Sequence, residues 1–266
     1  MQFHPASAGL RQPSAGVNPS PPSRLEPASQ ALAQLAALAG STNSSECMCS
    51  IGLACEGADL AQAGFAQTHE NRRARQTIYR RGDPSQDVIV ICSGWAFRYN
   101  QLSDGRRQIL SILLPGDVIS ATALFHAPLD FSVQALTDVR YSRINREEVR
   151  EHFQGQEFIA FVSRLLIAER RDADDQMVDL GQRLAEERIA GLVLRLRTRF
   201  LARGEVQDES FSFPLRQQHI ADITGLTSVH VSRVIGHLRK SGLIEIAGGR
   251  IALHNVAELQ RIGDMR

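Results

Sequence analysis

The segment from Arg216 to Lys240, RQQHIADITGLTSVHVSRVIGHLRK, constrains the fold of this chain more than any other stretch. Its first apolar face ends at Gly225, a residue that readily adopts the positive φ of a tight turn. Thr227 follows where a helix N-cap is expected, and apolar residues then recur at helical spacing. Two short helices joined by such a turn predict a helix-turn-helix, whose second helix enters the DNA major groove.

The predicted DNA-binding residues come from both helices of this segment. Arg233 is the main candidate for a base contact, because one guanidinium can bind guanine O6 and N7 together. The alternative is an ordinary helical hairpin with a solvated arginine face. The full predicted set is Arg216, Gln217, Gln218, Thr227, Ser228, Val229, Ser232, Arg233 and Arg239.

The charge of the chain shows that any nucleic-acid surface has to be local. The net charge is +1, and the composition, 43% hydrophobic and 22% charged, is typical of a soluble globular protein. Between positions 214 and 250, five basic residues stand against two acidic ones. That excess is modest, and a dimer would double it.

We expect a cytoplasmic protein with no membrane partner. No apolar run approaches the ~18 residues of a membrane span. The apolar stretch at 28–40 follows a Pro-rich lead without a basic region, which argues against a secretory signal. A transit peptide stays open, because the first 45 residues contain one acidic residue, Glu26.

The middle of the chain reads as a series of short strands. From about Gln76 to Ile144, β-like runs alternate with turn signals such as Asp104-Gly105 and Pro115-Gly116-Asp117. Strands broken by a turn every ten or so residues predict a barrel, sandwich or roll. A helical pattern then continues to about Gly181, and Gly248-Gly249 predicts the hairpin of a winged helix.

Three motifs in this layout resemble the CRP/FNR family of cyclic-AMP receptor and oxygen-sensing proteins. They are LAEERIAGLVLRL (184–196), GLTSVHVSRVIGHLRKSGLI (225–244) and LPGD (114–117). The resemblance extends from Cys47 to Ile262 and is strongest to the oxygen-sensing, FNR-like branch. It implies a homodimer that binds a palindromic operator in double-stranded DNA, and RNA polymerase if the protein is an activator. Many relatives carry Glu at the position of Val229, so we expect a related but altered half-site.

The expected fold class is α+β, with four parts in chain order. Residues 1–45 are expected to be a disordered tail, and 46–152 a Cys-bearing segment with an antiparallel β-roll, a jelly roll like those that bind cyclic nucleotides. By the resemblance, this roll is the sensor. Residues 153–182 are expected to form the dimerisation helix, and 183–266 the winged helix-turn-helix.

The resemblance also argues against cAMP as the effector. Cyclic-nucleotide members of the family hold phosphate with an Arg-Ser pair and ribose with a Gly-Glu pair. Those positions are Phe131-Ser132 and Ser120-Ala121 here, so the guanidinium and the carboxylate are both missing. An alternative function, a nucleotide-type binding module that regulates a protein partner, lacks the same anchor and leaves the helix-turn-helix unexplained.

Three cysteines suggest a different signal. Cys47, Cys49 and Cys55 precede the roll, and CSIGLAC resembles the loop that binds an iron–sulfur cluster in oxygen-sensing relatives. The first pair is C-x-C rather than C-x2-C, and the fourth ligand of a [4Fe-4S] cluster is unknown, with Cys92 and Ser142 as the candidates. A cluster-free thiol switch and an unknown ligand, or none, remain alternatives. No other metal site is predicted.

The sequence contains none of the catalytic motifs that we sought, so we expect no enzymatic activity and no catalytic residue. It lacks a Gly-rich phosphate loop, a metalloprotease helix and a G-x-S-x-G elbow. The acidic end of the connecting helix suggests a mechanism of control. If Asp172, Asp175 or Asp179 faces its twin across a two-fold axis, repulsion opposes dimerisation; a solvated acidic face is the alternative.

Overall fold

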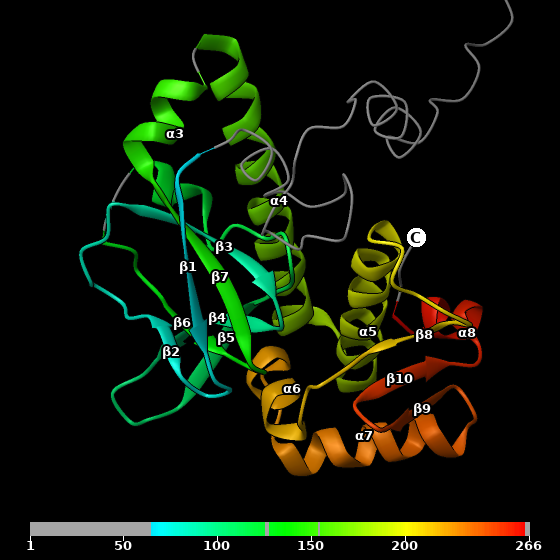
Figure 1. Ribbon diagram of the computed structural model, residues 1–266. Helices are drawn as coiled ribbons and strands as arrows, with labels where there is room; N and C mark the ends of the chain where they lie inside the picture. Colours follow the sequence, from blue (N-terminus) through cyan, green and yellow to red (C-terminus); the bar gives the residue numbers. More distant parts are fainter. Residues whose placement is uncertain (1–64, 126–127, 154, 264–266) are drawn as a thin grey trace, which may run out of the picture.

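The computed structural model describes residues 65–125, 128–153 and 155–263. A β-roll comes first in the chain, and a long helix follows it. The C-terminal winged helix lies next to the roll (Figure 1). This is the α+β architecture that the sequence predicts.

The roll consists of two antiparallel sheets. One has the strand order β1-β7-β3 and the other β2-β6-β4-β5. Asp104-Gly105 turns the β4–β5 hairpin, with Gly105 at φ 87°. The bounds are β1 Gln67–Arg72, β2 Thr77–Tyr79, β3 Asp87–Ser93, β4 Ala96–Gln101, β5 Arg107–Leu113, β6 Ser132–Ala135 and β7 Val139–Asn145, with a 3-10 helix η1 at Ala121–Leu124.

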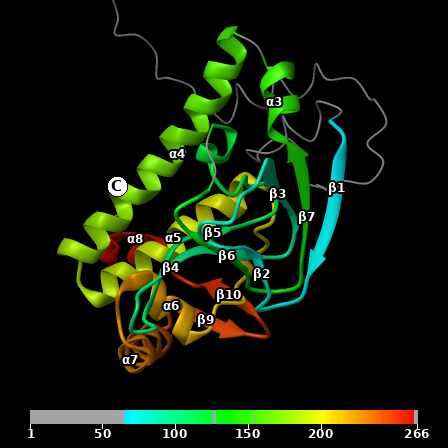
Figure 2. The same ribbon diagram turned by 90° about the vertical axis from the view of Figure 1, so that its left-hand side faces the viewer.

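Helices connect the roll to the winged helix. The long helix α4 runs beside the roll, as the turned view shows (Figure 2), and α5 follows it directly. No helix in the described ranges has the length and hydropathy needed to cross a membrane. The bounds are α3 Arg146–His152, α4 Gly155–Gln182, α5 Ala185–Ala202, β8 Ser210–Ser212, α6 Gln217–Thr224, α7 Ser228–Lys240, β9 Ile244–Ala247, β10 Arg250–Leu253 and α8 Val256–Ile262.

The predicted wing is present. Strands β9 and β10 pair antiparallel, and both residues of their Gly248-Gly249 turn have positive φ. Strand β8 completes this sheet in the order β8-β10-β9. The wing is therefore part of a three-stranded sheet, which contacts α7 through β9.

One apolar cluster joins the roll to the winged helix. Trp95 and Phe97 of the roll belong to the same buried cluster as Phe200 of α5 and Phe211 of β8. The rings of Trp95 and Phe200 are 5.5 Å apart, and those of Phe200 and Phe211 are 5.2 Å apart. Because apolar packing is close and non-directional, this shared core couples the two units mechanically.

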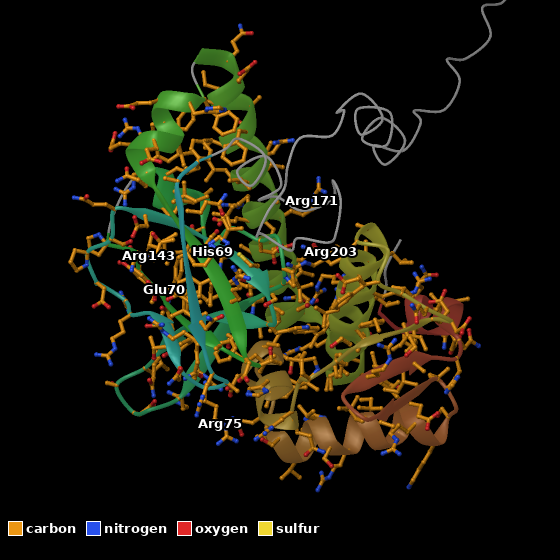
Figure 3. All side chains as sticks on the ribbon, in the orientation of Figure 1. His69, Glu70, Arg75, Arg143, Arg171 and Arg203 are labelled. Atoms are coloured by element: carbon orange, nitrogen blue, oxygen red, sulfur yellow. The ribbon has the colours of Figure 1, made fainter. Side chains whose placement is uncertain are left out.

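A buried carboxylate fixes α5 on the roll. Asp117, in the LPGD turn, is 4% exposed and accepts the backbone N–H of Leu114 at 2.7 Å. It also binds Arg199 of α5 and Arg203, the C-cap of that helix, with Arg203 Nη2 at 2.7 Å from Oδ1. Arg203 lies in the seam between the roll and α5 (Figure 3). A buried ion pair persists only with good geometry, so this contact sets the register of α5.

A second buried carboxylate corrects the repulsion hypothesis. Asp179 is 4% exposed and is bound by Arg183 at 2.7 Å and by Arg195 within its own chain. A neutralised, enclosed carboxylate cannot repel a twin across a two-fold axis. Asp172 and Asp175 are both exposed, and Asp172 lines the cavities that α4 forms with the roll and with α5.

We predict that Asp117→Asn destabilises the fold by about 3 kcal/mol, because two arginines at the seam lose their counter-charge. Denaturant unfolding measures this loss. The exposed pair of Glu258 and Arg261 provides the control, since surface ion pairs contribute little. An Asp117→Asn protein as stable as Glu258→Gln would show that the Asp117 contact does not hold the fold.

Candidate nucleic-acid interface

The turn between α6 and α7 has the geometry that the sequence predicts. Gly225 ends α6 with φ 67°, and a Cβ there would lie 2.8 Å from Leu180 Cδ2 at the end of α4. The conformation of this turn therefore requires glycine, and a Cβ would in addition force the Leu180 side chain to shift. Thr227 caps α7, its hydroxyl accepting the backbone N–H of His230 at 3.2 Å.

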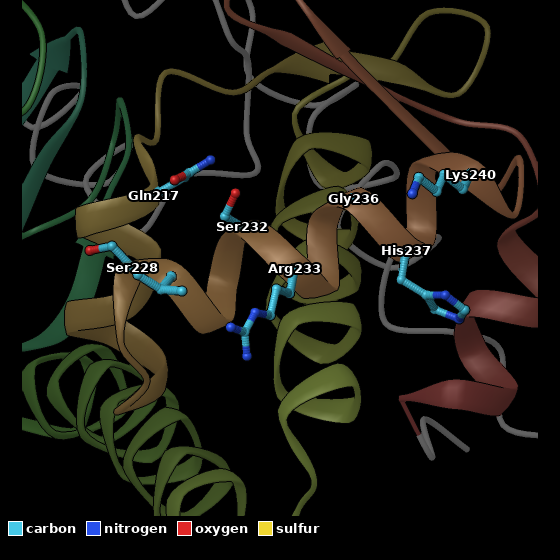
Figure 4. A pocket seen from close by; sticks show the side chains of 8 residues that line it. Gln217, Ser228, Ser232, Arg233, Gly236, His237 and Lys240 are labelled. Atoms are coloured by element: carbon cyan, nitrogen blue, oxygen red, sulfur yellow. The ribbon is translucent and has the colours of Figure 1, made fainter.

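The outer face of α7 forms an open groove of about 640 Å³ (Figure 4). Val229 is 63% exposed there, and Ser232 and Arg233 are exposed beside it. Among the described residues, none accepts a hydrogen bond from the exposed Arg233 guanidinium, so its donors point to solvent. The groove is lined by Gln217, Ser228, Val229, Ser232, Arg233, Gly236, His237 and Lys240.

The structure brings together five of the predicted residues in this groove and places the other four outside its lining. Gln217, Ser228, Val229, Ser232 and Arg233 line the groove. The remaining four are outside this lining: Arg216, Gln218, Thr227 and Arg239.

Sequence reasoning missed three groove residues in the last turns of α7. Gly236, His237 and Lys240 follow the predicted residues at intervals of four, the spacing that keeps side chains on one helix face. This period was available in the sequence. His237 Nε2 also lies 3.6 Å from the Glu186 carboxylate of α5.

Gln218 is held by its neighbours, although it does not line the groove. Ser228 Oγ donates to Gln218 Oε1 at 2.8 Å, and Gln218 Nε2 donates to Asp222 Oδ1 at 2.7 Å. The first turn of α7 is thus tied to α6 by side chains as well as by the turn.

His219 lies between the start of α6 and the roll. Its Nδ1 accepts the backbone N–H of Arg216 at 3.1 Å, and its ring is 5.9 Å from that of Phe97. Burial lowers the pKa of His219, the charge of Arg107 lowers it further, and Asp222 partly opposes this shift. Two further cations act in the same direction, Arg216 and Arg75, the latter at the lower edge of the roll (Figure 3). The site therefore favours the neutral imidazole, which alone can accept at Nδ1.

A second cavity, of about 670 Å³, lies between the roll and α4. At its polar end, Glu169 of α4 binds Arg98 Nη1 at 3.0 Å. The same carboxylate accepts the backbone N–H of Ala121 at 2.9 Å and is 3.4 Å from Ser120 Oγ. The Phe131 ring covers the Arg98 guanidinium at 5.2 Å.

The predicted cluster ligands are not assembled in the described part of the chain. Cys47, Cys49 and Cys55 lie outside the described residues. Cys92 in β3 is 4% exposed and Ser142 in β7 is 1% exposed, so both candidates for the fourth ligand are inside the roll. Within residues 65–125, 128–153 and 155–263, no group of three His, Cys, Asp or Glu side chains is arranged to hold a metal ion.

Comparisons with known proteins match both halves of the structure. The family "Cyclic nucleotide-binding domain" matches residues 69–156, and "Crp-like helix-turn-helix domain" matches residues 187–262. The transcriptional activatory protein AadR of Rhodopseudomonas palustris is 31% identical over 67% of this chain and 74% of its own. An anaerobic regulatory protein of Aggregatibacter actinomycetemcomitans is 28% identical over 69% and 72%. The structure of FixK2 from Bradyrhizobium japonicum has a TM-score of 0.67 and 28% identity, covering 74% of this chain and 97% of that one.

We predict that His219 makes stability depend on pH. The unfolded chain titrates this imidazole near pH 6.5, and the folded pKa is lower. Between the two values the unfolded state binds more protons, so stability present above about pH 6.5 is lost as the pH falls through this window. His219→Gln keeps an acceptor at this helix position and does not titrate. Melting temperatures from about pH 5 to 8 should show the wild type losing stability relative to His219→Gln on the acid side. A constant difference across this range would contradict the prediction.

Proposed function

Because this chain belongs to the CRP/FNR family of transcription regulators, we propose that it is a homodimer that reads a palindromic operator through α7. The observation that carries the proposal is the groove of α7, with Arg233 unpaired among the described side chains. The family is one of regulators, not enzymes. A module that only regulates a protein partner would leave the matched helix-turn-helix without a role.

Readout of the operator is assigned to the middle of the groove. Arg233 supplies the bidentate donor for a guanine, and Ser232 beside it can contact a base edge or a phosphate. Val229, exposed at the same level, offers methyl groups to a thymine C5-methyl and has no acceptor for a cytosine amino group. Lys240 and His237 extend the groove toward the backbone of the DNA.

The dimer seam is assigned to α4. This helix has 28 residues and exposes large apolar side chains along its length, although it is charged elsewhere. An exposed apolar face of this kind is costly in water and marks an interaction site. Because a two-fold operator is bound by a dimer, we assign a second copy of α4 to this face. The exposed apolar residues are Ile159, Leu166, Ile167, Met177 and Val178.

Selection of duplexes from a random pool tests the operator directly. We expect a two-fold symmetric sequence with half-sites centred about 34 Å apart, one helical turn of DNA. Recovery of a single, asymmetric half-site would contradict the dimeric reader.

We predict that Arg233→Gln lowers the preference for the selected operator by ~1–3 kcal/mol and relaxes one position of each half-site. Competition binding against single-base variants measures both effects. Arg261→Gln, on α8, removes the same charge and should leave the preference unchanged. Equal losses in the two variants would mean that Arg233 contributes only charge.

The effector of the roll is proposed to be a molecule or signal other than cAMP. In this structure the Glu169 carboxylate already accepts a hydrogen bond from the backbone N–H of Ala121 and forms an ion pair with the Arg98 guanidinium. The hydroxyl of Ser132 accepts the backbone N–H of Arg81 at 3.0 Å. The backbone N–H of Ala121 and the Arg98 guanidinium are thus engaged within the chain, and a cyclic phosphate would have to displace a carboxylate from them.

Oxygen or redox state is the signal that we propose instead. Cys47, Cys49 and Cys55 would supply thiolates to a [4Fe-4S] cluster, which carries oxygen-sensitive redox chemistry when bound. The relative named as an anaerobic regulatory protein supports this choice. Since Cys92 and Ser142 are enclosed in the roll, we propose that the fourth ligand comes from another residue of the chain.

We predict that protein purified without oxygen contains iron and acid-labile sulfide and is bleached by air, and that Cys55→Ser abolishes both. Elemental analysis and visible absorption measure this. Colourless, iron-free protein would rule out the cluster. Altered operator binding on thiol oxidation of that protein would favour the thiol switch.

A further inference from the structure

A line of polar contacts runs from the DNA-reading helix into the roll. Ser228 of α7 donates to Gln218, and Gln218 donates to Asp222 of α6, both within 2.8 Å. Asp222 Oδ2 then accepts Arg107 Nε at 2.8 Å and Nη2 at 2.6 Å. Arg107 lies on β5 and also donates to Gln134 of β6 at 3.1 Å. Five side chains therefore connect the first turn of α7 to two strands of the roll.

The central pair of this line is enclosed. The Asp222 side chain is 9% exposed and that of Arg107 is 22% exposed. The Arg107 guanidinium lies over the rings of Phe97 and Tyr99, at 4.9 and 5.6 Å from their centroids. Rings on the same sheet fix the plane of the guanidinium, and both donors on that side meet one carboxylate oxygen. The pair therefore has one defined geometry rather than several.

The last turn of α6 is held from the same side. Gln108 Nε2 of β5 and Gln176 Nε2 of α4 both donate to the carbonyl of Ile223, at 3.1 and 3.3 Å. Gln176 Nε2 also donates to the Ile109 carbonyl of β5 at 2.8 Å. The roll and α4 thus hold α6 by hydrogen bonds at two points, the Asp222 side chain and the Ile223 carbonyl. Helix α7 follows α6 through a three-residue turn.

We propose that Arg107 and Asp222 are positioning residues for DNA recognition: through Gln218 they fix Ser228, and with it the start of α7, relative to the β-roll. The inference rests on the proposed reading of DNA by α7. Neither residue lines the reading groove, so neither is assigned a contact with DNA. A change in the roll that moves β5 would alter the same contacts and reach the reading helix by this route.

The test uses the full-length protein and the operator selected by the wild type. Arg107→Gln and Asp222→Asn should each weaken operator binding about tenfold, and binding to unrelated duplex far less, so the specificity ratio falls. Asp222→Asn is the sharper variant. It removes a negative charge, so electrostatics alone would strengthen binding to DNA. Arg106→Gln, on the adjacent and exposed residue, is the matched control for loss of a positive charge.

Two readouts separate positioning from simple destabilisation. The emission of Trp95, the only tryptophan, reports whether the roll still packs on Phe200, and it should match the wild type in every variant. In a double-mutant cycle, Ser228→Ala should cost less affinity in Arg107→Gln than in the wild type, because the relay is already broken.

Three outcomes overturn the inference. Specificity unchanged in folded Arg107→Gln and Asp222→Asn would show that the contact is structural only. Additive losses in the cycle would show that Ser228 is not reached from Arg107. Stronger operator binding by either variant would mean that the contact between α6 and the roll hinders DNA recognition by α7. A wild type that selects no operator would remove the proposed function itself.

Discussion

The enclosed carboxylate of Asp117 is the contact on which the arrangement of this molecule depends. It lies where the roll meets α5, and the two arginines that neutralise it come from that helix and its C-cap. Removing charges from water is costly, and only a fixed geometry repays the cost. The shared apolar cluster that contains Trp95, Phe200 and Phe211 then packs with α5 held in this position. The winged helix is therefore attached to the roll by a rigid seam rather than by a flexible link.

The arginines at the seams differ from Arg233 in both exposure and pairing. Those at the seams, such as Arg107, Arg195 and Arg203, are enclosed and each has a carboxylate partner. Arg233 is exposed and has no recorded acceptor among the described residues. A guanidinium that is paired contributes to architecture, and one that is unpaired on a helix face can bind a ligand. The position of Arg233 on the outer face of α7, beside Ser232 and Val229, therefore identifies the reading surface more specifically than net charge does.

Much of the fold follows from local patterns, and the parts that do not are long-range or polar. Gly225, Thr227 and the apolar period predict the helix-turn-helix, and Gly248-Gly249 predicts the wing. Strand β1 was missed, because QTHENR has no apolar alternation. The pairings of Arg98 with Glu169 and of Arg107 with Asp222 join residues 71 and 115 positions apart, which no local pattern reveals. The acidic run on α4 was overinterpreted at Asp179, since its arginine partners are set by the packing of α5. The cysteine hypothesis concerns residues outside the described ranges and stays a prediction.

Native-state hydrogen exchange tests the central claim, that the roll and the winged helix form one mechanical unit. Exchange followed by mass spectrometry gives an opening free energy for each segment. The account predicts that β9 and β10 of the wing open with the same free energy as β3 and β7 of the roll. A wing that opens at a much lower free energy, with the roll still protected, would contradict it.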